Sequence, residues 1–195
     1  MNTPAHLIFA AAAFARAEKE PGDGARAVNG AALLGGLLPD FSLYFAFLWG
    51  VGVLGLTPAF FFGEVYFWPP MQAVFAVDNS FVVWSFLLGV ALTVRHLPLI
   101  AFAGSGLLHL LFDFTLHNDD ARMHFWPVSD WVFISPVSYW DPDHYGGIAA
   151  LAEIAICVAL LALLWRRFSG VLAKILITLG LATQVLPGLV WAFMF

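Results

Sequence analysis

Long apolar stretches without charged side chains, separated by short polar segments, dominate the chain. The longest covers the 23 residues 41–63, and another covers the 21 residues 175–195. A helix of about 20 apolar residues crosses the hydrocarbon core of a bilayer, so the pattern predicts an all-α integral membrane protein with about six transmembrane helices, five to six in all. The expected helices cover residues 3–17, 26–56, 80–95, 98–117, 147–166 and 171–194.

The second expected helix and the segments between helices refine this picture. Residues 26–56 are too many for one straight crossing, and Pro39 is expected to kink or break the helix near Asp40 because proline removes a backbone donor. Residues 57–79 and 118–146 are expected to be long loops. The second is rich in Trp, Pro and Asp, which suits an ordered cap at the membrane interface. The whole chain, 1–195, is therefore expected to be a single membrane domain with 118–146 as its cap loop.

Composition supports a membrane protein and excludes other classes. Hydrophobic residues make up 62% of the chain and charged residues 11%, against about 25% charged residues in soluble domains. The expected partner is the lipid bilayer. A net charge of −5 with eight Lys and Arg argues against a nucleic-acid binder. The single cysteine, Cys157, allows neither an internal disulfide nor a cysteine-based metal cluster.

The basic residues predict an orientation. Seven of the eight lie between expected helices on one side of the membrane, and only Arg122 lies on the other. The positive-inside rule makes the basic side cytoplasmic. Both termini and the two long loops are then expected to face outward. The basic side carries Arg16, Lys19, Arg26, Arg95, Arg166, Arg167 and Lys174.

Polar residues inside the fourth expected helix form a regular pattern. His109, Asp113 and His117 follow one another at intervals of four, which places them on one face of a helix. Imidazole and carboxylate together are ligands for zinc and other divalent metals, and charged residues in a membrane helix commonly mark function. The alternative is a hydrogen-bonded pair, His109 with Asp113, that only joins helices.

Other polar residues reach the same outward side once the orientation is set. His6 lies near the outward N-terminus, Asp40 follows Pro39, and Asp78 lies just before the third expected helix. The alternative role for Asp40 and for the segment 78–80 is helix capping. In the cap loop the nearby polar residues are Asp119, Asp120 and His124, which either complete a metal site or lie in a solvated turn. Glu153 has no evident partner.

Several motifs resemble those of a known family. They are Thr3-Pro4-Ala5-His6, Gly35-Gly36-Leu37-Leu38-Pro39-Asp40, and His109-Leu110-Leu111-Phe112-Asp113 followed by Phe125-Trp126-Pro127. In this order they resemble the bacterial inner-membrane metal-dependent hydrolases, a group distantly similar to zinc-dependent phospholipase C. The likeness covers about residues 3–145. Residues 135–142 look like a proteobacterial subgroup whose members often carry a cobalamin-biosynthesis label.

The resemblance implies a metal site and a location. Its implied ligands are His6, Asp40, His109 and Asp113. It implies the bacterial inner membrane, and with the basic-residue pattern this puts the termini and long loops in the periplasm. The chain departs from the family in one motif, since Asp78-Asn79-Ser80 stands where family members commonly have Thr-His-Ser. Asp78 could replace the missing histidine.

Two hypotheses follow. The first is a membrane-embedded hydrolase that acts at the outer leaflet on a lipid or lipid-linked phosphoester. It would use one or two divalent ions, expected to be zinc, to activate water, with Asp78 or Asp120 as general base. The second is a non-catalytic structural or assembly subunit of a larger inner-membrane complex, in which the polar cluster fixes helix packing. The ligands expected under the first hypothesis are His6, Asp40, His109, Asp113 and His117.

Overall fold

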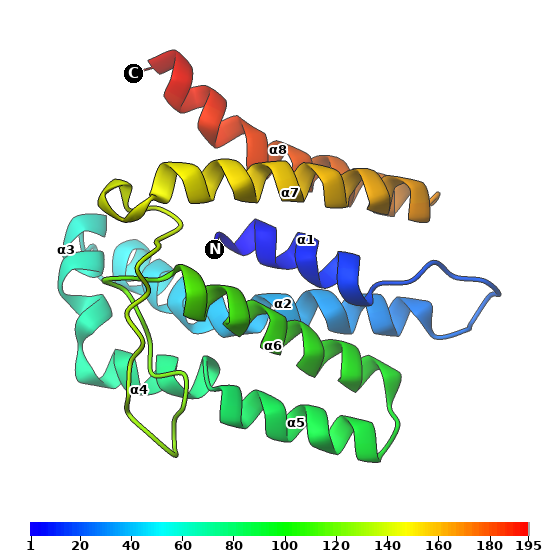
Figure 1. The fold of residues 1–195 in the computed structure, drawn as a ribbon, viewed down its shortest axis with the longest axis horizontal. Coiled ribbons are helices and arrows are strands. Elements are labelled where there is room, and N and C mark those ends of the chain that lie inside the picture. The colour runs from blue at the N-terminus through cyan, green and yellow to red at the C-terminus, as the bar shows by residue number, and fades with distance from the viewer. Residues whose placement is uncertain (195) are drawn as a thin grey trace.

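The protein is a bundle of helices whose long members run between two ends of the molecule (Figure 1). The computed structural model describes the backbone of residues 1–194 and the side chains of residues 1–186. The described chain contains no strand. Its α-helices are α1 Thr3–Phe14, α2 Ala25–Phe47, α3 Pro58–Gly63, α4 Pro69–Asp78, α5 Phe81–Thr93, α6 Leu97–Leu116, α7 Gly146–Arg167 and α8 Val171–Met194. Shorter helical turns are the π-helix Leu48–Val53 and the 3-10 helices Val65–Phe67 and Pro142–His144.

Four helical segments have the length and apolarity needed to cross a membrane, as in a multi-pass membrane protein. They are Ala25–Val53, Pro69–Thr93, Leu97–Leu116 and Gly146–Arg167. The other two expected spans are shorter apolar helices where the structure describes them, Thr3–Phe14 and Val171–Leu186. At 1.5 Å per residue the 12-residue α1 is about 18 Å long, which is less than a bilayer core.

The segment expected to be a loop at 57–79 is mostly helical, so that expectation was wrong. Pro58 and Pro69 stand at the first positions of α3 and α4, where the missing backbone donor costs nothing and the fixed φ favours a helix. Thr57 caps α3 by accepting a hydrogen bond from the backbone N–H of Phe60. The prolines in this segment therefore begin helices.

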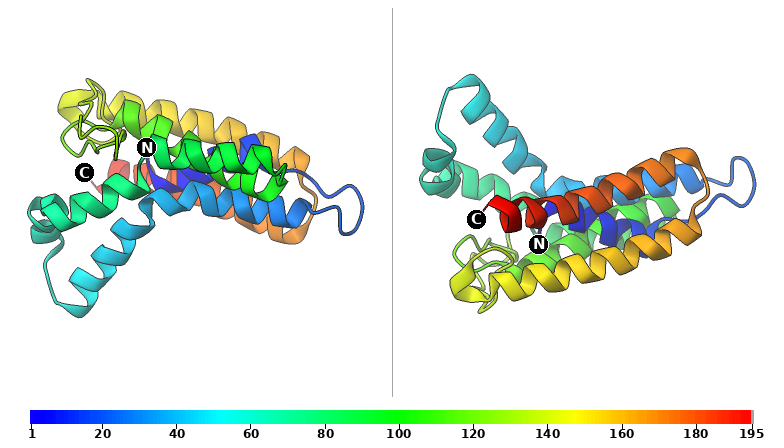
Figure 2. Two further views of the ribbon diagram at one scale, coloured as in Figure 1. Left: turned by 90° about the horizontal axis from the view of Figure 1, so that it is seen from below. Right: turned by 90° about the horizontal axis from the view of Figure 1, so that it is seen from above.

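The break expected near Pro39 is also absent, because α2 continues through Pro39 to Phe47. Figure 2 shows that the second half of α2 nevertheless bends away from the bundle, as expected where a proline removes one backbone hydrogen bond. Asp40 lies inside this helix and does not cap a new one. The bend turns the outer half of α2 toward α3, where Phe47 contacts Phe61 and Phe62.

Close packing holds α1 and α6 against the middle of α2. A Cβ added to Gly35 would lie 2.0 Å from the backbone oxygen of Phe102 in α6, and one added to Gly36 would lie 2.9 Å from Cβ of Ala10 in α1. Small residues of this kind let membrane helices approach closely. The two glycines thus bring three helices together one turn before Asp40.

Residues 118–145, apart from the short 3-10 helix, follow an irregular path over the end of the molecule that also holds the N-terminus (Figure 1). Hydrogen bonds tie this segment to the end of α6. Ser135 donates to the backbone oxygen of Thr115 at 2.6 Å, and the backbone N–H of Tyr139 donates to that of Leu116 at 3.0 Å. Phe114 packs between Phe133 and other aromatic rings of the segment.

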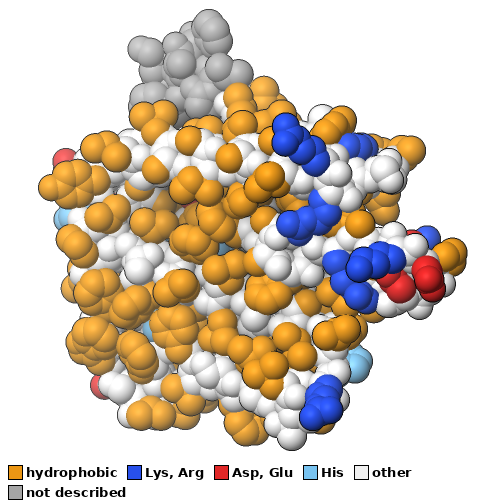
Figure 3. Space-filling view, turned by 45° about the vertical axis from the view of Figure 1, so that its right-hand side comes forward, with side chains coloured by type: hydrophobic (Ala, Val, Ile, Leu, Met, Phe, Trp, Pro, Cys, Tyr) orange, Lys and Arg blue, Asp and Glu red, His pale blue; other side chains and the backbone are white. Residues whose placement is uncertain are grey.

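The surface separates apolar from basic residues. Large apolar side chains are exposed along the helices, with Phe86 at 74%, as lipid-facing residues would be. Figure 3 shows the Lys and Arg side chains gathered toward one end. They lie at and beside the turns after α1, α5 and α7, and the N-terminus and residues 118–145 lie at the opposite end (Figure 1).

Candidate metal centre

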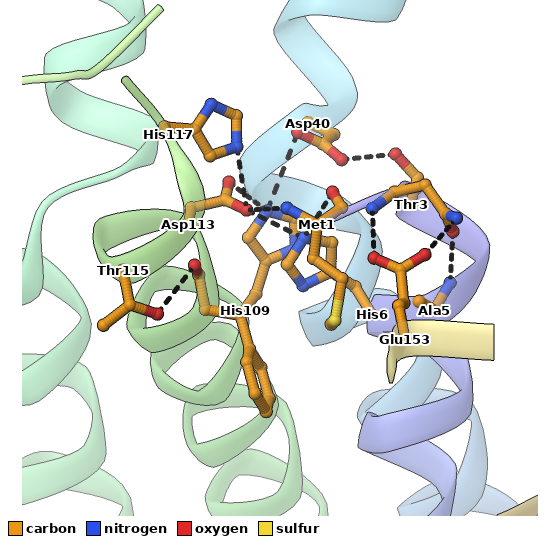
Figure 4. A network of polar contacts seen from close by, with 12 residues as sticks. Met1, Thr3, Ala5, His6, Asp40, His109, Asp113, Thr115, His117 and Glu153 are labelled. Atoms are coloured by element: carbon orange, nitrogen blue, oxygen red, sulfur yellow. Dashed lines mark hydrogen bonds and ion pairs between the residues drawn. The ribbon is translucent and has the colours of Figure 1, made fainter. Parts of the chain in front are cut away.

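Asp113, near the end of α6, is the centre of a buried polar cluster (Figure 4). Its Oδ1 lies 2.9 Å from Nε2 of His6 and 3.2 Å from Nε2 of His117. Its Oδ2 lies 3.0 Å from Nε2 of His109. The backbone amine of Met1 is 3.3 Å from Oδ1. Three imidazole nitrogens thus surround one carboxylate.

Helix periodicity brings three of these residues together, as the sequence predicts. His109 and Asp113 are successive residues on the inner face of α6. His117 is the residue after its last turn, and its backbone N–H donates to the Asp113 carbonyl at 3.1 Å. The spacing of four therefore survives the end of the helix.

His6 and Asp40 reach the cluster from α1 and α2. The rings of His6 and His109 are stacked, with centroids 3.5 Å apart and planes 9° apart. Oδ1 of Asp40 lies 3.6 Å from Nε2 of His109, and Thr3 donates a hydrogen bond to Oδ2 of Asp40. One donor atom from each of His6, Asp40 and His109 lies within 4.8 Å of the others.

The orientation of the histidines suits a metal ion. Nδ1 of His109 lies 2.8 Å from the backbone oxygen of Gly36, and Nδ1 of His117 lies 2.8 Å from Oδ2 of Asp120. An acceptor at Nδ1 keeps the proton on that nitrogen and leaves the Nε2 lone pair for a metal. Both Nε2 atoms face Asp113.

The donors lie close enough together to share an ion. Donors about 2.0–2.2 Å from a shared tetrahedral zinc lie roughly 3.3–3.6 Å from one another. The distance between His109 and Asp40 is 3.6 Å, whereas the three imidazole distances to Asp113 are 2.9, 3.0 and 3.2 Å, which are hydrogen-bond lengths. Nδ1 of His6 and both ring nitrogens of His117 are buried without a well-directed hydrogen bond among the described residues. The cluster could therefore hold a metal ion.

Asp120 is linked to the centre through His117. Burial would raise the pKa of Asp120, but its contact with His117 holds that pKa below the ordinary value. Burial would lower the pKa of His117, but Asp113 and Asp120 raise it. The contact therefore favours an ionised Asp120 carboxylate and a doubly protonated His117 ring.

Residues 78–80 are placed differently from one another. Asp78 is only partly buried and has no contact with the donor cluster among the described residues, so its role as ligand or base stays a prediction. Ser80 caps α5, as the capping alternative predicts. Asn79 is fully buried, and its side chain donates to the Pro39 and Phe75 carbonyls.

Arg122 is the residue that the sequence interpretation missed, because it was counted only as an exception to the charge asymmetry. It is 3% exposed, and its Nη1 donates to Oδ1 of Asn79 at 2.8 Å. The same nitrogen lies 3.7 Å from Oδ1 of Asp40 and 3.8 Å from Oδ2 of Asp113. Its position between conspicuously polar Asp120 and His124 was the available signal.

The remaining candidates lie at the edge of the site or outside it. Asp119 is exposed at a cavity wall. His124 packs against Phe81 and Phe114, and burial lowers its pKa to about 4, so its ring is neutral near pH 7. Glu153 accepts hydrogen bonds from the backbone and side chain of Asn2, which supplies the partner that the sequence does not reveal.

A cavity of about 730 Å³ adjoins the cluster. Asp40, His117, Asp120 and Arg122 line its polar side. Its apolar lining comes from α2, the α3 region and the 118–145 segment, and includes Leu43, Phe47, Phe62, Phe67 and Trp140. A larger cavity of about 860 Å³ lies among α1, α2, α7 and α8 and is lined by none of the predicted ligands.

Comparison with known proteins found no match among protein-family models, curated proteins or solved structures. The candidate metal centre therefore rests on the geometry of this chain.

Proposed function

We propose that the protein is a membrane-embedded metal-dependent hydrolase that acts on a lipid or lipid-linked phosphoester. The observation that carries the proposal is the meeting of three imidazole Nε2 atoms around Asp113 beside a cavity that both polar and apolar residues line. A purely structural hydrogen-bond network would not require such a cavity. Polar donors at one end of an otherwise apolar pocket are typical of ligand sites.

The two oxygens of Asp113 divide the donors into two groups. Oδ1 faces His6 and His117, whereas Oδ2 faces His109, which in turn faces Asp40. His6, Asp40, His109, Asp113 and His117 would hold one or two divalent ions, with zinc as the expected metal from the imidazole and carboxylate ligands. The bound metal would supply Lewis acidity toward a phosphoryl oxygen and lower the pKa of the attacking water.

Asp120 is better placed than Asp78 for the predicted proton-accepting role. It lines the cavity, and its Oδ2 lies 2.8 Å from His117. A carboxylate in this position holds the His117 ring in one tautomer and stays charged near pH 7. The Asp120 carboxylate, which lines the cavity, is thus the group that would accept a proton released there.

The surroundings of the cavity favour an amphiphilic substrate. Phe47, Phe62 and Phe67 would contact the apolar chain of a lipid substrate. The phosphoester of that substrate would lie beside the candidate metal ligands. The basic turns lie at the far end of the molecule, so by the positive-inside rule we expect the site at the outer leaflet. The membrane expected from the family resemblance is the bacterial inner membrane, with the site on its periplasmic side.

The first test is the metal content of purified protein in mild detergent, measured by elemental mass spectrometry. We expect near-stoichiometric zinc, manganese or iron in the wild type and its loss in the double variant His109→Ala/Asp113→Ala. His96→Asn is the matched control, because His96 lies at the opposite end and caps α6, a role that Asn retains. Metal-free, folded wild-type protein would contradict the proposal.

The second test is hydrolysis of short-chain phospholipids and lipid-linked phosphates by the same three proteins. We expect the double variant to lose at least about 100-fold in rate, since metal activation of water supplies several kcal/mol. His96→Asn should keep the wild-type rate. Full activity after both substitutions would exclude the proposed centre.

One observation favours the second candidate function, a non-catalytic subunit. If His109 and His117 each donate from both ring nitrogens, they are cations and, with Arg122, balance Asp40, Asp113 and Asp120 without a metal. The cluster would then only join helices. Co-purification with a membrane protein at fixed stoichiometry, without bound metal, would support this alternative.

A further inference from the structure

Arg122 carries a buried positive charge whose position needs an explanation. Its guanidinium is held from several directions by α4 and the turn before it. Nε donates to the hydroxyl of Tyr66 at 3.3 Å, Nη1 donates to Asn79 at 2.8 Å, and the guanidinium carbon lies 5.2 Å from the centre of the Phe75 ring. The side chain is therefore fixed before any ligand binds.

The nearby carboxylates do not form hydrogen bonds with the Arg122 guanidinium. Buried arginines commonly form short, two-point contacts with a carboxylate, but the nearest oxygens of Asp40 and Asp113 are 3.7 and 3.8 Å from Nη1. Both distances exceed a hydrogen bond. The same two carboxylates face histidine Nε2 atoms, as metal ligands would.

One donor of Arg122 is left for a ligand. Among the described residues Nη2 has no hydrogen-bond partner, and Arg122 lines the cavity with Asp40 and His117. Tyr139 lines the same cavity with its phenol group. The cavity thus presents a guanidinium and a hydroxyl beside the candidate metal ligands.

We propose that Arg122 binds a non-bridging phosphoryl oxygen of the substrate. A planar guanidinium suits phosphate oxygens, and an arginine beside a metal centre stabilises charge on a transferring phosphoryl group. This inference rests on the proposed function and adds an oxyanion subsite to it. The subsite would receive a free phosphate or the phosphate of a lipid headgroup by the same chemistry.

The test is calorimetric titration of the metal-loaded protein in detergent with inorganic phosphate and, separately, with dihexanoyl phosphatidic acid. Arg122→Gln should weaken binding of the preferred probe about 10- to 100-fold, the range for a charge-assisted hydrogen bond. Arg122→Lys keeps the charge but loses the planar fork, so its affinity should lie between the two. The matched control is Arg26→Gln, whose side chain is 88% exposed at the opposite end.

The controls separate anion binding from a structural role. Metal content should stay at the wild-type level in Arg122→Gln, because removing a cation does not weaken the attraction of the carboxylates for an ion. Kinetic measurements on a phosphoester should show the loss for Arg122→Lys as well, where the buried charge is retained. If Arg122→Gln does not fold, the comparison of Arg122→Lys with wild type decides the question.

The outcomes distinguish this inference from the proposed function. Phosphate binding that depends on Arg122, in a protein that hydrolyses nothing, would support the subsite and contradict the hydrolase. Hydrolysis with a probe affinity unchanged in both Arg122 variants would contradict the subsite alone. Stronger dependence for phosphatidic acid than for inorganic phosphate would identify the lipid headgroup as the source of the oxyanion.

Discussion

Asp120 is not one of the proposed ligands, but its carboxylate contacts one of them, His117. It lies 2.8 Å from Nδ1 of His117, and the other ring nitrogen of His117 faces Asp113. A carboxylate at this position fixes the ring and increases its basicity as a ligand. The contact follows from the spacing of three residues just beyond the end of α6.

We therefore predict that Asp120→Asn weakens metal binding about 10- to 100-fold without unfolding the protein. The measurement is competition for the bound ion with a chelator of known affinity. Asp119→Asn is the matched control, because Asp119 is adjacent and exposed. Equal metal affinity in the two variants would show that Asp120 does not support His117.

The sequence predicts the candidate metal ligands better than it predicts the residues that surround them. His109, Asp113 and His117 are recognisable because helix periodicity converts a spacing of four into one face. His6 and Asp40 are predicted from topology and from the resemblance. Arg122 is different, because its burial depends on Asn79 and Tyr66, which meet it only through the tertiary fold.

At the scale of elements, α2 decides where the site lies. Its carbonyl at Gly36 faces His109, and its side chain at Asp40 faces the same ring. Both contacts require α2 to lie very close to α1 and α6, which the paired glycines permit. The helix then bends away (Figure 2) and leaves room for the cavity.

Gly35→Ala should consequently destabilise the protein by about 1–3 kcal/mol or more, the range for overpacking, because its Cβ would overlap the Phe102 carbonyl at 2.0 Å. The measurement is the apparent melting temperature in detergent, together with metal content. Gly30→Ala is the control in the same helix, since nothing lies within 4 Å of its added Cβ. That change should be neutral or slightly stabilising. A Gly35 variant as stable as the Gly30 variant would contradict the close approach.

The errors in the predicted elements have physical causes. A kink or break was expected at Pro39, and a long loop was expected at residues 57–79. In the structure Pro39 bends a continuous helix, while Pro58 and Pro69 begin new ones. Local sequence does not separate these roles, because a proline can begin, bend or end a helix depending on the packing around it.

At the scale of the whole molecule, polarity is divided between two ends. The candidate centre, the cavity and residues 118–145 lie at one end, and the basic turns lie at the other (Figures 1 and 3). Apolar composition alone indicates helices that can cross a membrane, since it depends on residue types and not on packing. Orientation depends on the few charges at the helix ends, and it determines which leaflet could supply a substrate.

Single cysteines can test this orientation in intact bacterial cells that express the protein. Cys157 is buried, and Cys157→Ala gives a background without thiols. We would add either Asp143→Cys or Glu20→Cys to the Cys157→Ala variant. Both positions are exposed, residue 143 in the 118–145 segment and residue 20 in the turn after α1. We expect a membrane-impermeant maleimide to label position 143 in cells with a permeable outer membrane, and position 20 only after the inner membrane is opened. The reverse pattern would place the centre at the cytoplasmic leaflet, where the same metal chemistry would meet a different pool of phosphoesters.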